Sequence, residues 1–250
     1  MIRISTFAFA FFTSAIAFAA QAAEVRNIVI VHGALADGSG WRKATEILER
    51  RGYNVTIVQQ PITSLADDVA ATNRVLDLQT GPTLLVGHSY GGMVISEAGN
   101  RPDVAGLVYV AAFQPDKGES LIGLASSKPA GGMNIRETKD GEYLYLDRAA
   151  FANDFAADLP KDDAAFLARS QVFAAKKAFT AKANDPAWRV KKTWSIVATR
   201  DRSINPDLER DMAQRADSIV TEIEASHAVF ASQPEKVADV IDAAANELGK

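Results

Sequence analysis

Short apolar runs alternate with stretches of helical periodicity along most of this chain of 250 residues. The runs are rich in valine and isoleucine, which is typical of strands buried on both faces. They cover residues 25–31, 55–58, 83–86, 107–111, 194–199 and 219–223. Helices are expected between and after them, at 41–51, 65–78, 91–100, 206–215 and 234–248. This alternation predicts an α/β fold: a mainly parallel sheet of about six strands with helices on both faces.

Residues 114–190 interrupt the alternation. They hold no convincing buried strand, but several segments rich in alanine and phenylalanine have helical character, at 148–157, 162–170 and 173–183. An insertion at this point would fold over the carboxyl ends of the strands, where α/β proteins bind ligands. The sequence therefore predicts a core of residues 23–113 and 191–250 and a helical cap of residues 114–190. More helices of the main layer are the alternative.

Residues 1–22 have the pattern of a secretory signal peptide. A cationic start at Arg3 precedes the apolar stretch 4–20, and Ala20-Gln21-Ala22 has the small-x-small form that signal peptidase accepts. Cleavage is expected after Ala22, with Ala23 as the near alternative, followed by export, to the periplasm in a Gram-negative source. The apolar stretch is short for a span of about 20 residues, so stable membrane insertion is not expected; an uncleaved anchor is the alternative.

Composition excludes several functions. The 27 basic and 31 acidic residues give a net charge of −4, which argues against the basic face of a nucleic-acid-binding protein. Without any cysteine the chain can form no disulfide, thiolate nucleophile or thiolate metal site. Three histidines argue against a histidine-rich metal centre, although carboxylate sites stay open. No cofactor and no metal are therefore expected, and the oligomeric state stays open.

A glycine-rich turn, Gly87-His88-Ser89-Tyr90-Gly91-Gly92, joins the run at 83–86 directly to the next helix. Gly-x-Ser-x-Gly between a strand and a helix is the pattern of a nucleophile elbow. The turn lifts the serine above the edge of the sheet, and the helix N-terminus behind it favours developing negative charge. Ser89 is therefore the predicted nucleophile. A serine that merely caps the helix is the alternative.

A serine hydroxyl needs a base, and three histidines could supply it. His88 adjoins Ser89, so its side chain should point elsewhere, and His32 ends the first strand, where a structural hydrogen bond is expected. His227 lies in the loop between the last strand and the final helix. That is the place of the base in the chain order serine, acid, histidine. His227 is therefore the predicted base.

The base needs a carboxylate that holds its tautomer and stabilises the imidazolium. Asp201 is favoured because it lies just beyond the strand at 194–199. Its alternative role is a surface ion pair with Arg200 or Arg202. Asp116, beyond the preceding strand, is the runner-up for the acid.

The loop after the first strand can approach the turn at Ser89 and complete an oxyanion hole of two backbone N–H groups. By their positions, Ala34 and Tyr90 are expected to donate them. Leu35 and Phe113 follow strand ends at the same edge and are expected to line a mainly apolar substrate pocket.

Five segments occur in an order that resembles the α/β-hydrolase superfamily. They are Val-His-Gly-Ala at 31–34, Gly-His-Ser-Tyr-Gly-Gly-Met at 87–93, Ala-Ala-Phe-Gln-Pro-Asp at 111–116, Ala-Thr-Arg-Asp at 198–201 and Ser-His at 226–227. More narrowly, they resemble the branch of plant methyl esterases, hydroxynitrile lyases and many small bacterial esterases. The resemblance spans the chain after the signal peptide apart from the cap. It implies a triad of Ser89, Asp201 and His227, with Ala34 and Tyr90 as oxyanion donors.

The residues and the resemblance together predict hydrolysis of a small carboxylic ester (EC 3.1.1 type) through an acyl-enzyme on Ser89. A hydroxynitrile lyase would use the same triad, but those enzymes resemble one another in a lysine after the catalytic histidine, where this chain has Ala228. A cofactor-free haloperoxidase or perhydrolase, in which peroxide intercepts the acyl-enzyme, is a second alternative. A relative that only binds a ligand is a third.

Overall fold

The core of the computed structural model, which describes residues 24–249, is one parallel sheet of six strands. The predicted signal peptide, residues 1–22, lies outside the described residues. The strand order is β2-β1-β3-β4-β8-β9. The bounds are β1 Asn27–Val31, β2 Asn54–Val58, β3 Thr83–Ser89, β4 Val104–Ala112, β8 Lys192–Ala198 and β9 Ile219–Ile223. The expected parallel sheet is therefore confirmed.

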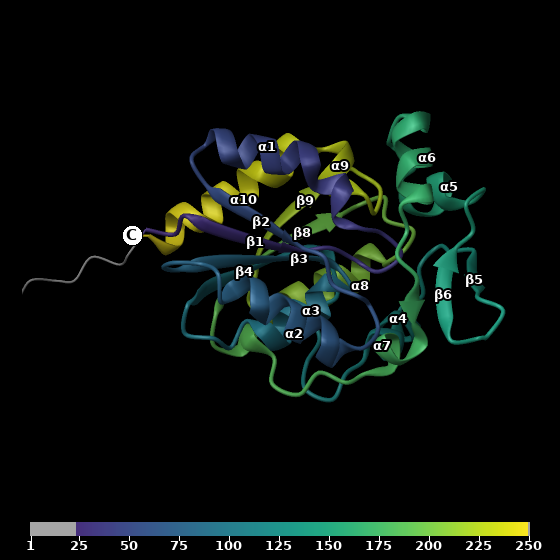
Figure 1. The fold of residues 1–250 in the computed structure, drawn as a ribbon, viewed down its shortest axis with the longest axis horizontal. Coiled ribbons are helices and arrows are strands. Elements are labelled where there is room, and N and C mark those ends of the chain that lie inside the picture. Colours follow the sequence, from purple (N-terminus) through teal and green to yellow (C-terminus); the bar gives the residue numbers. More distant parts are fainter. Residues whose placement is uncertain (1–23, 250) are drawn as a thin grey trace, which may run out of the picture.

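Helices cover both faces of this sheet, as predicted. Figure 1 shows α1 and α10 on one face and α2 and α3 on the other. The core helices are α1 Arg42–Arg50, α2 Leu65–Leu76, α3 Gly91–Ala98, α8 Pro206–Arg215, α9 Val229–Ser232 and α10 Pro234–Leu248. Within residues 24–249, no helix has the length and apolar character needed to cross a membrane.

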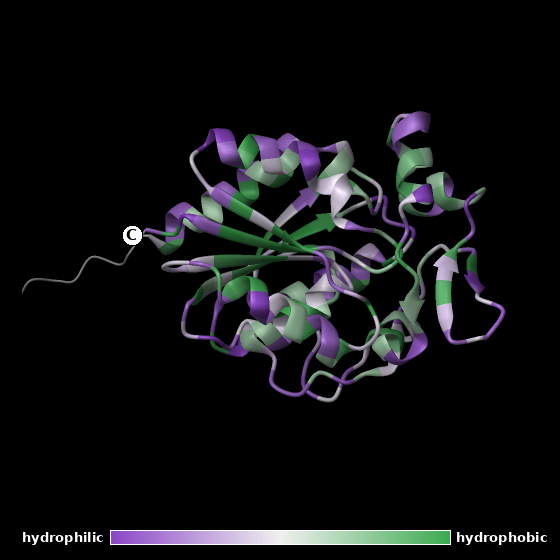
Figure 2. Cartoon of the chain, in the orientation of Figure 1, coloured by the Kyte–Doolittle hydropathy of each residue, from purple (hydrophilic) through white to green (hydrophobic). Residues whose placement is uncertain are grey.

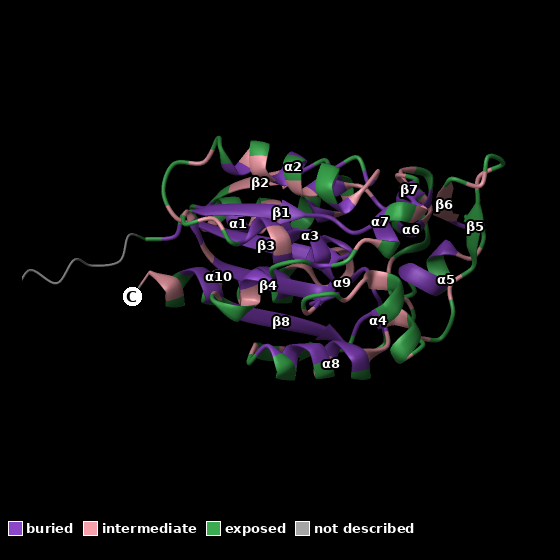
Figure 3. Ribbon diagram, turned by 90° about the horizontal axis from the view of Figure 1, so that it is seen from below, coloured by how far each residue is buried: buried purple, intermediate pink, exposed green. Residues whose placement is uncertain are grey.

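Burial explains the continuous apolar runs of the central strands. Every residue of β1 and β3 is buried, whereas the edge strands β2 and β9 keep exposed positions. Figure 2 shows the hydrophobic strands between helices with polar outer faces, and Figure 3 shows the same contrast as burial. In a strand buried on both faces, apolar residues do not alternate with polar ones. The sequence signal of such a strand is therefore a short, unbroken apolar run.

The segment 114–190 contains the expected helices and also a small sheet that the sequence did not predict. Its helices are α4 Leu121–Ser127, α5 Phe151–Phe155, α6 Lys161–Arg169 and α7 Lys176–Thr180. Strands β5 Ile135–Glu137, β6 Tyr143–Leu146 and β7 Ala174–Ala175 form a separate antiparallel sheet. Figure 1 shows these elements beyond the carboxyl ends of the core strands, where the insertion was predicted. The boundaries of the cap stay a prediction.

The strands of this small sheet were missed because they bury little surface. All three residues of β5 are exposed, and most of β6 is half-buried, so neither strand forms an apolar run. The available signal was Asp140-Gly141 in the connecting turn, where Gly141 takes a φ of +72°. An Asp-Gly pair is typical of a tight hairpin turn.

Close backbone contacts fix the start of α3 at the end of β1. A Cβ at Gly91 would lie 2.3 Å from the carbonyl oxygen of Val31. A Cβ at Gly92 would lie 2.0 Å from that of Phe113, just after β4. Only glycine allows α3 to approach both segments this closely. The turn before α3, which carries Ser89, is thereby held against the ends of β1 and β4.

Candidate active site

Ser89 occupies the strained turn between β3 and α3. Its φ is +53°, in the left-handed region that serine rarely adopts, and Tyr90 alone separates the end of β3 from the start of α3. The N–H of Phe113 donates to the carbonyl oxygen of Ser89 at 3.1 Å, which ties the turn to the end of β4. Such strain at a serine between strand and helix is the feature of a nucleophile elbow.

The predicted base and acid lie in direct contact. His227 Nδ1 lies 2.5 Å from Asp201 Oδ2, and both side chains are buried. Asp201 follows β8 and His227 follows β9, and these strands are neighbours in the sheet. A hydrogen bond to an ionised Asp201 keeps the proton on Nδ1, so Nε2 remains free to accept a proton.

Two backbone groups fix the orientation of the acid. Ser203 and Ile204 donate their N–H groups to Asp201 Oδ1, at 2.6 and 3.0 Å. The alternative role of Asp201, a surface ion pair, does not fit its burial, and Arg200 pairs instead with Glu224. The runner-up acid, Asp116, pairs with Arg189 at an Nε–Oδ1 distance of 3.0 Å.

His88 connects the turn of Ser89 to the loop of His227. Its Nε2 donates to the carbonyl oxygen of His227 at 3.0 Å, and the two rings lie 4.6 Å apart. Complete burial, followed by the nearby His227, lowers the pKa of His88 well below its usual value. His88 is therefore a neutral hydrogen-bond donor to the backbone of the base. The sequence indicated only that its side chain points away from Ser89.

The loop after β1 lies against the same turn. A Cβ at Gly33 would lie 2.8 Å from Ser89 Cβ and 2.7 Å from His88 Nδ1, so this glycine permits the close approach. Ala34 follows directly in this loop and Tyr90 follows Ser89, and their role as oxyanion donors stays a prediction. Leu35, buried with a φ of +60°, continues the loop. Phe113, also buried, is held by its bond to Ser89.

His32, the remaining histidine, has a structural role. Its Nδ1 donates to the carbonyl oxygen of Gly33 at 2.8 Å, and Gln60 Nε2 donates to the carbonyl oxygen of His32 at 2.5 Å. Burial lowers the pKa of His32, so the ring is neutral. These bonds shape the loop that approaches Ser89.

Glu209 is a buried neighbour of Asp201 that the sequence did not predict. It belongs to α8, is buried, and contacts the side chain of Asp201. Burial, and then the charge of Asp201, raises the pKa of Glu209 well above its usual value. Two close carboxyl groups do not both ionise readily, so Glu209 is neutral and adds no second charge beside Asp201. A glutamate on a polar helix carries no sequence signal for this contact.

Asp68 anchors the side chain of Tyr90, whose backbone N–H is an expected oxyanion donor. The Tyr90 hydroxyl donates to Asp68 Oδ2 at 2.6 Å, and the N–H of Ile62 donates to Oδ1 at 2.8 Å. Asp68 lies in the first turn of α2 and is fully buried. Burial raises its pKa to about 6, although both hydrogen bonds favour the ionised form.

Comparisons with known proteins agree with the observed fold. The model of a family described as the alpha/beta hydrolase family matches residues 28–240. The carbendazim hydrolyzing esterase of Nocardioides sp. is 35% identical over 112 residues, 39% of this chain and 46% of that protein, so the match spans less than half of that esterase. The pyrethroid hydrolase of Sphingobium wenxiniae is 28% identical over 249 residues, 87% of this chain and 86% of that protein.

A solved structure extends the comparison to the fold. Polyneuridine aldehyde esterase superposes with a TM-score of 0.76 at 20% identity, covering 88% of this chain and 100% of that one. This likeness shows the fold alone.

Asp68 should make stability fall as the pH rises from about 4 to about 6. Its pKa is about 6 in the folded protein and about 3.9 in an unfolded chain. Between these values the folded state holds a proton that the unfolded state has released. The stabilisation is therefore complete below about pH 4 and is lost as the pH rises through about 6.

The Asp68→Asn variant tests this pH dependence because it cannot titrate. Its amide can still accept from Ile62 and donate to the Tyr90 oxygen, so the local structure should persist. In urea denaturation across this pH range, the free energy of unfolding should fall less in Asp68→Asn than in the parent. The control, Asp67→Asn, should keep the parent's slope over this range, because bonds from Ser64 and Thr63 lower the pKa of Asp67 and its titration therefore lies below about pH 4. Parallel curves for the parent and Asp68→Asn would refute this role of Asp68.

Proposed function

Because the chain belongs to the α/β-hydrolase family and is an enzyme of the carboxylesterase type, we propose that it cleaves small carboxylic esters through an acyl-enzyme on Ser89. The observation that carries this proposal is the buried 2.5 Å contact between His227 Nδ1 and Asp201 Oδ2. A base oriented in this way, at the same edge of the sheet as a serine in a strained turn, is the arrangement that activates a hydroxyl nucleophile.

The proposed reaction has two halves. In the first, Ser89 Oγ attacks the ester carbonyl while His227 Nε2 takes its proton, and the N–H groups of Ala34 and Tyr90 stabilise the oxyanion. The intermediate collapses, and His227 protonates the departing alcohol. In the second half His227 deprotonates a water molecule, which attacks the acyl group and releases the acid and Ser89. Asp201 stays ionised throughout and stabilises the imidazolium.

The substrate class follows from the buried apolar residues near Ser89 and from the relatives. Leu35 and Phe113, both buried, would contact an uncharged, mainly apolar part of the ester. The relatives' names include a carbendazim hydrolyzing esterase and a pyrethroid hydrolase. We propose ester hydrolysis for this chain on this basis, but not the substrates of these relatives. Ala228 is fully buried and offers no cation beside His227, which argues against the lyase alternative.

We also propose that the enzyme is exported, on the basis of the signal-peptide pattern of residues 1–22. Expression of the full chain in a Gram-negative host should release a periplasmic protein that begins at Ala23. The intact mass of that protein measures the cleavage site. Retention of Met1 in a membrane-bound product would instead support the uncleaved anchor.

Turnover of p-nitrophenyl esters of increasing acyl length tests the proposed activity. The protein of residues 23–250 should hydrolyse short esters, and the length at which the rate falls measures the size of the acyl pocket. Ser89→Ala and His227→Ala should each lower kcat by at least about a thousandfold, because the nucleophile and the base act as one unit.

Ser170→Ala is the matched control, because it removes a half-buried serine that directly follows α6, whose hydroxyl donates to the carbonyl oxygen of Leu167, and it should keep the parent rate. A folded parent without turnover on any of these esters would count against the esterase proposal. Full activity in Ser89→Ala would count against Ser89 as the nucleophile.

A further inference from the structure

The residues on both sides of His227 are hydrogen-bonded to one short segment, Phe151 to Asp158. After the base, the N–H of Ala228 donates to the carbonyl oxygen of Phe155 at 2.9 Å. Before it, the N–H of Ser226 donates to Asp158 Oδ2 at 3.1 Å, and the Ser226 hydroxyl donates to Asp158 Oδ1. The loop of the base is therefore held by a segment about 70 residues earlier in the chain.

The same segment contacts the ring of the base and the loop of the acid. The Phe155 ring packs edge-on against the imidazole of His227, with centroids 4.8 Å apart. The Ser203 hydroxyl donates to the carbonyl oxygen of Asp154 at 3.1 Å, while the Ser203 N–H holds Asp201. One segment thus connects both loops on which the His227–Asp201 contact depends.

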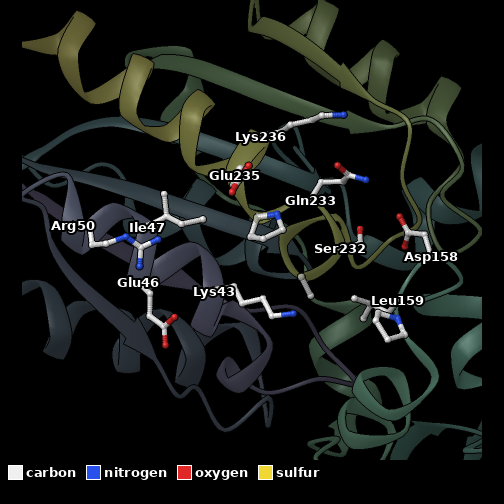
Figure 4. A pocket seen from close by; sticks show the side chains of 13 residues that line it. Lys43, Glu46, Ile47, Arg50, Asp158, Leu159, Ser232, Gln233, Glu235 and Lys236 are labelled. Carbon is white, nitrogen blue, oxygen red and sulfur yellow. The ribbon is translucent and has the colours of Figure 1, made fainter.

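Asp158 differs from its neighbours in this network because its side chain is exposed. It lies in the wall of a cavity of about 550 Å³ between the segment, α1 and the start of α10. Figure 4 shows Asp158 beside Leu159, at the end of this cavity opposite Arg50. Replacing an exposed carboxylate leaves no hole in the core, so variants at this position should fold.

We infer that Asp158 is a positioning residue for His227, holding the loop of the base through the backbone and hydroxyl of Ser226. This inference deepens the proposed function and rests on it. His88 separately holds the carbonyl oxygen of His227. Asp158 therefore controls the part of the loop that precedes His227. Small displacements of a catalytic group cost rate even when substrate binding is unchanged.

Steady-state kinetics against pH, on p-nitrophenyl acetate, give the first readout. Asp158→Ala removes both carboxylate acceptors of Ser226, leaving the 3.3 Å bond from its hydroxyl to the carbonyl oxygen of Phe155, and should lower kcat by about tenfold to a hundredfold. KM should change much less, because Asp158 does not touch Ser89. Asp158→Asn should recover most of the rate, since its amide can accept from the Ser226 N–H and donate to the Ser226 hydroxyl. Asp162→Asn removes the same charge from an exposed position of α6 and should match the parent.

Proton NMR gives a second readout that needs no turnover. The proton between His227 Nδ1 and Asp201 should give a signal far downfield, as expected for a short bond of 2.5 Å. This signal should shift or broaden in Asp158→Ala and stay in place in Asp158→Asn and Asp162→Asn. Ser226→Ala, which loses the hydroxyl bonds to Asp158 and Phe155 but keeps the backbone bond to Asp158, should give a smaller effect in the same direction.

The outcomes separate the two proposals. A folded Asp158→Ala with the parent's kcat and the parent's downfield signal would overturn the positioning role. A parent without turnover whose signal still moves in Asp158→Ala would keep the positioning role and reject the esterase reaction. An equal loss of kcat in Asp158→Asn and Asp158→Ala would show that the charge, and not the pair of bonds to Ser226, matters, and would also reject the inference.

Discussion

The buried contact between His227 and Asp201 is the constraint on which the rest of this site depends. An ionised carboxylate without partners would be costly to bury. Here Asp201 accepts from two backbone N–H groups and from His227, and a neutral Glu209 beside it adds no second charge. The charge is thereby tolerated in the interior, where it interacts more strongly with an imidazolium than it would in water.

The order of the strands places the three predicted site residues at one edge of the sheet. Ser89 ends β3, Asp201 follows β8 and His227 follows β9, and because all the strands are parallel these ends lie at one edge of the sheet. Glycines at the start of α3 hold the serine turn close to β1 and β4. The segment of Phe155 and Asp158 then packs over this edge and bonds to the loop of the base. The site is thus assembled from the core and completed by the insertion.

The sequence predicted the parts whose signals are local. The apolar runs identified the core strands, and the Gly-x-Ser-x-Gly turn identified the place of Ser89. The chain order of motifs then led to Asp201 and His227, which the structure brings within 2.5 Å. Contacts between distant residues left no such signal: Glu209 and Asp158 look like solvated positions until the fold brings them to Asp201 and Ser226.

The reaction of the protein with a fluorophosphonate, followed by intact-mass and peptide mass spectrometry, tests the central claim most directly. The parent should acquire one adduct, on the peptide that contains Ser89. In Asp201→Asn the same adduct should form at least about a hundredfold more slowly, because the base would lose its tautomer and its counter-charge. An adduct on another residue, or an Asp201→Asn variant that reacts at the parent's rate, would contradict the proposed triad.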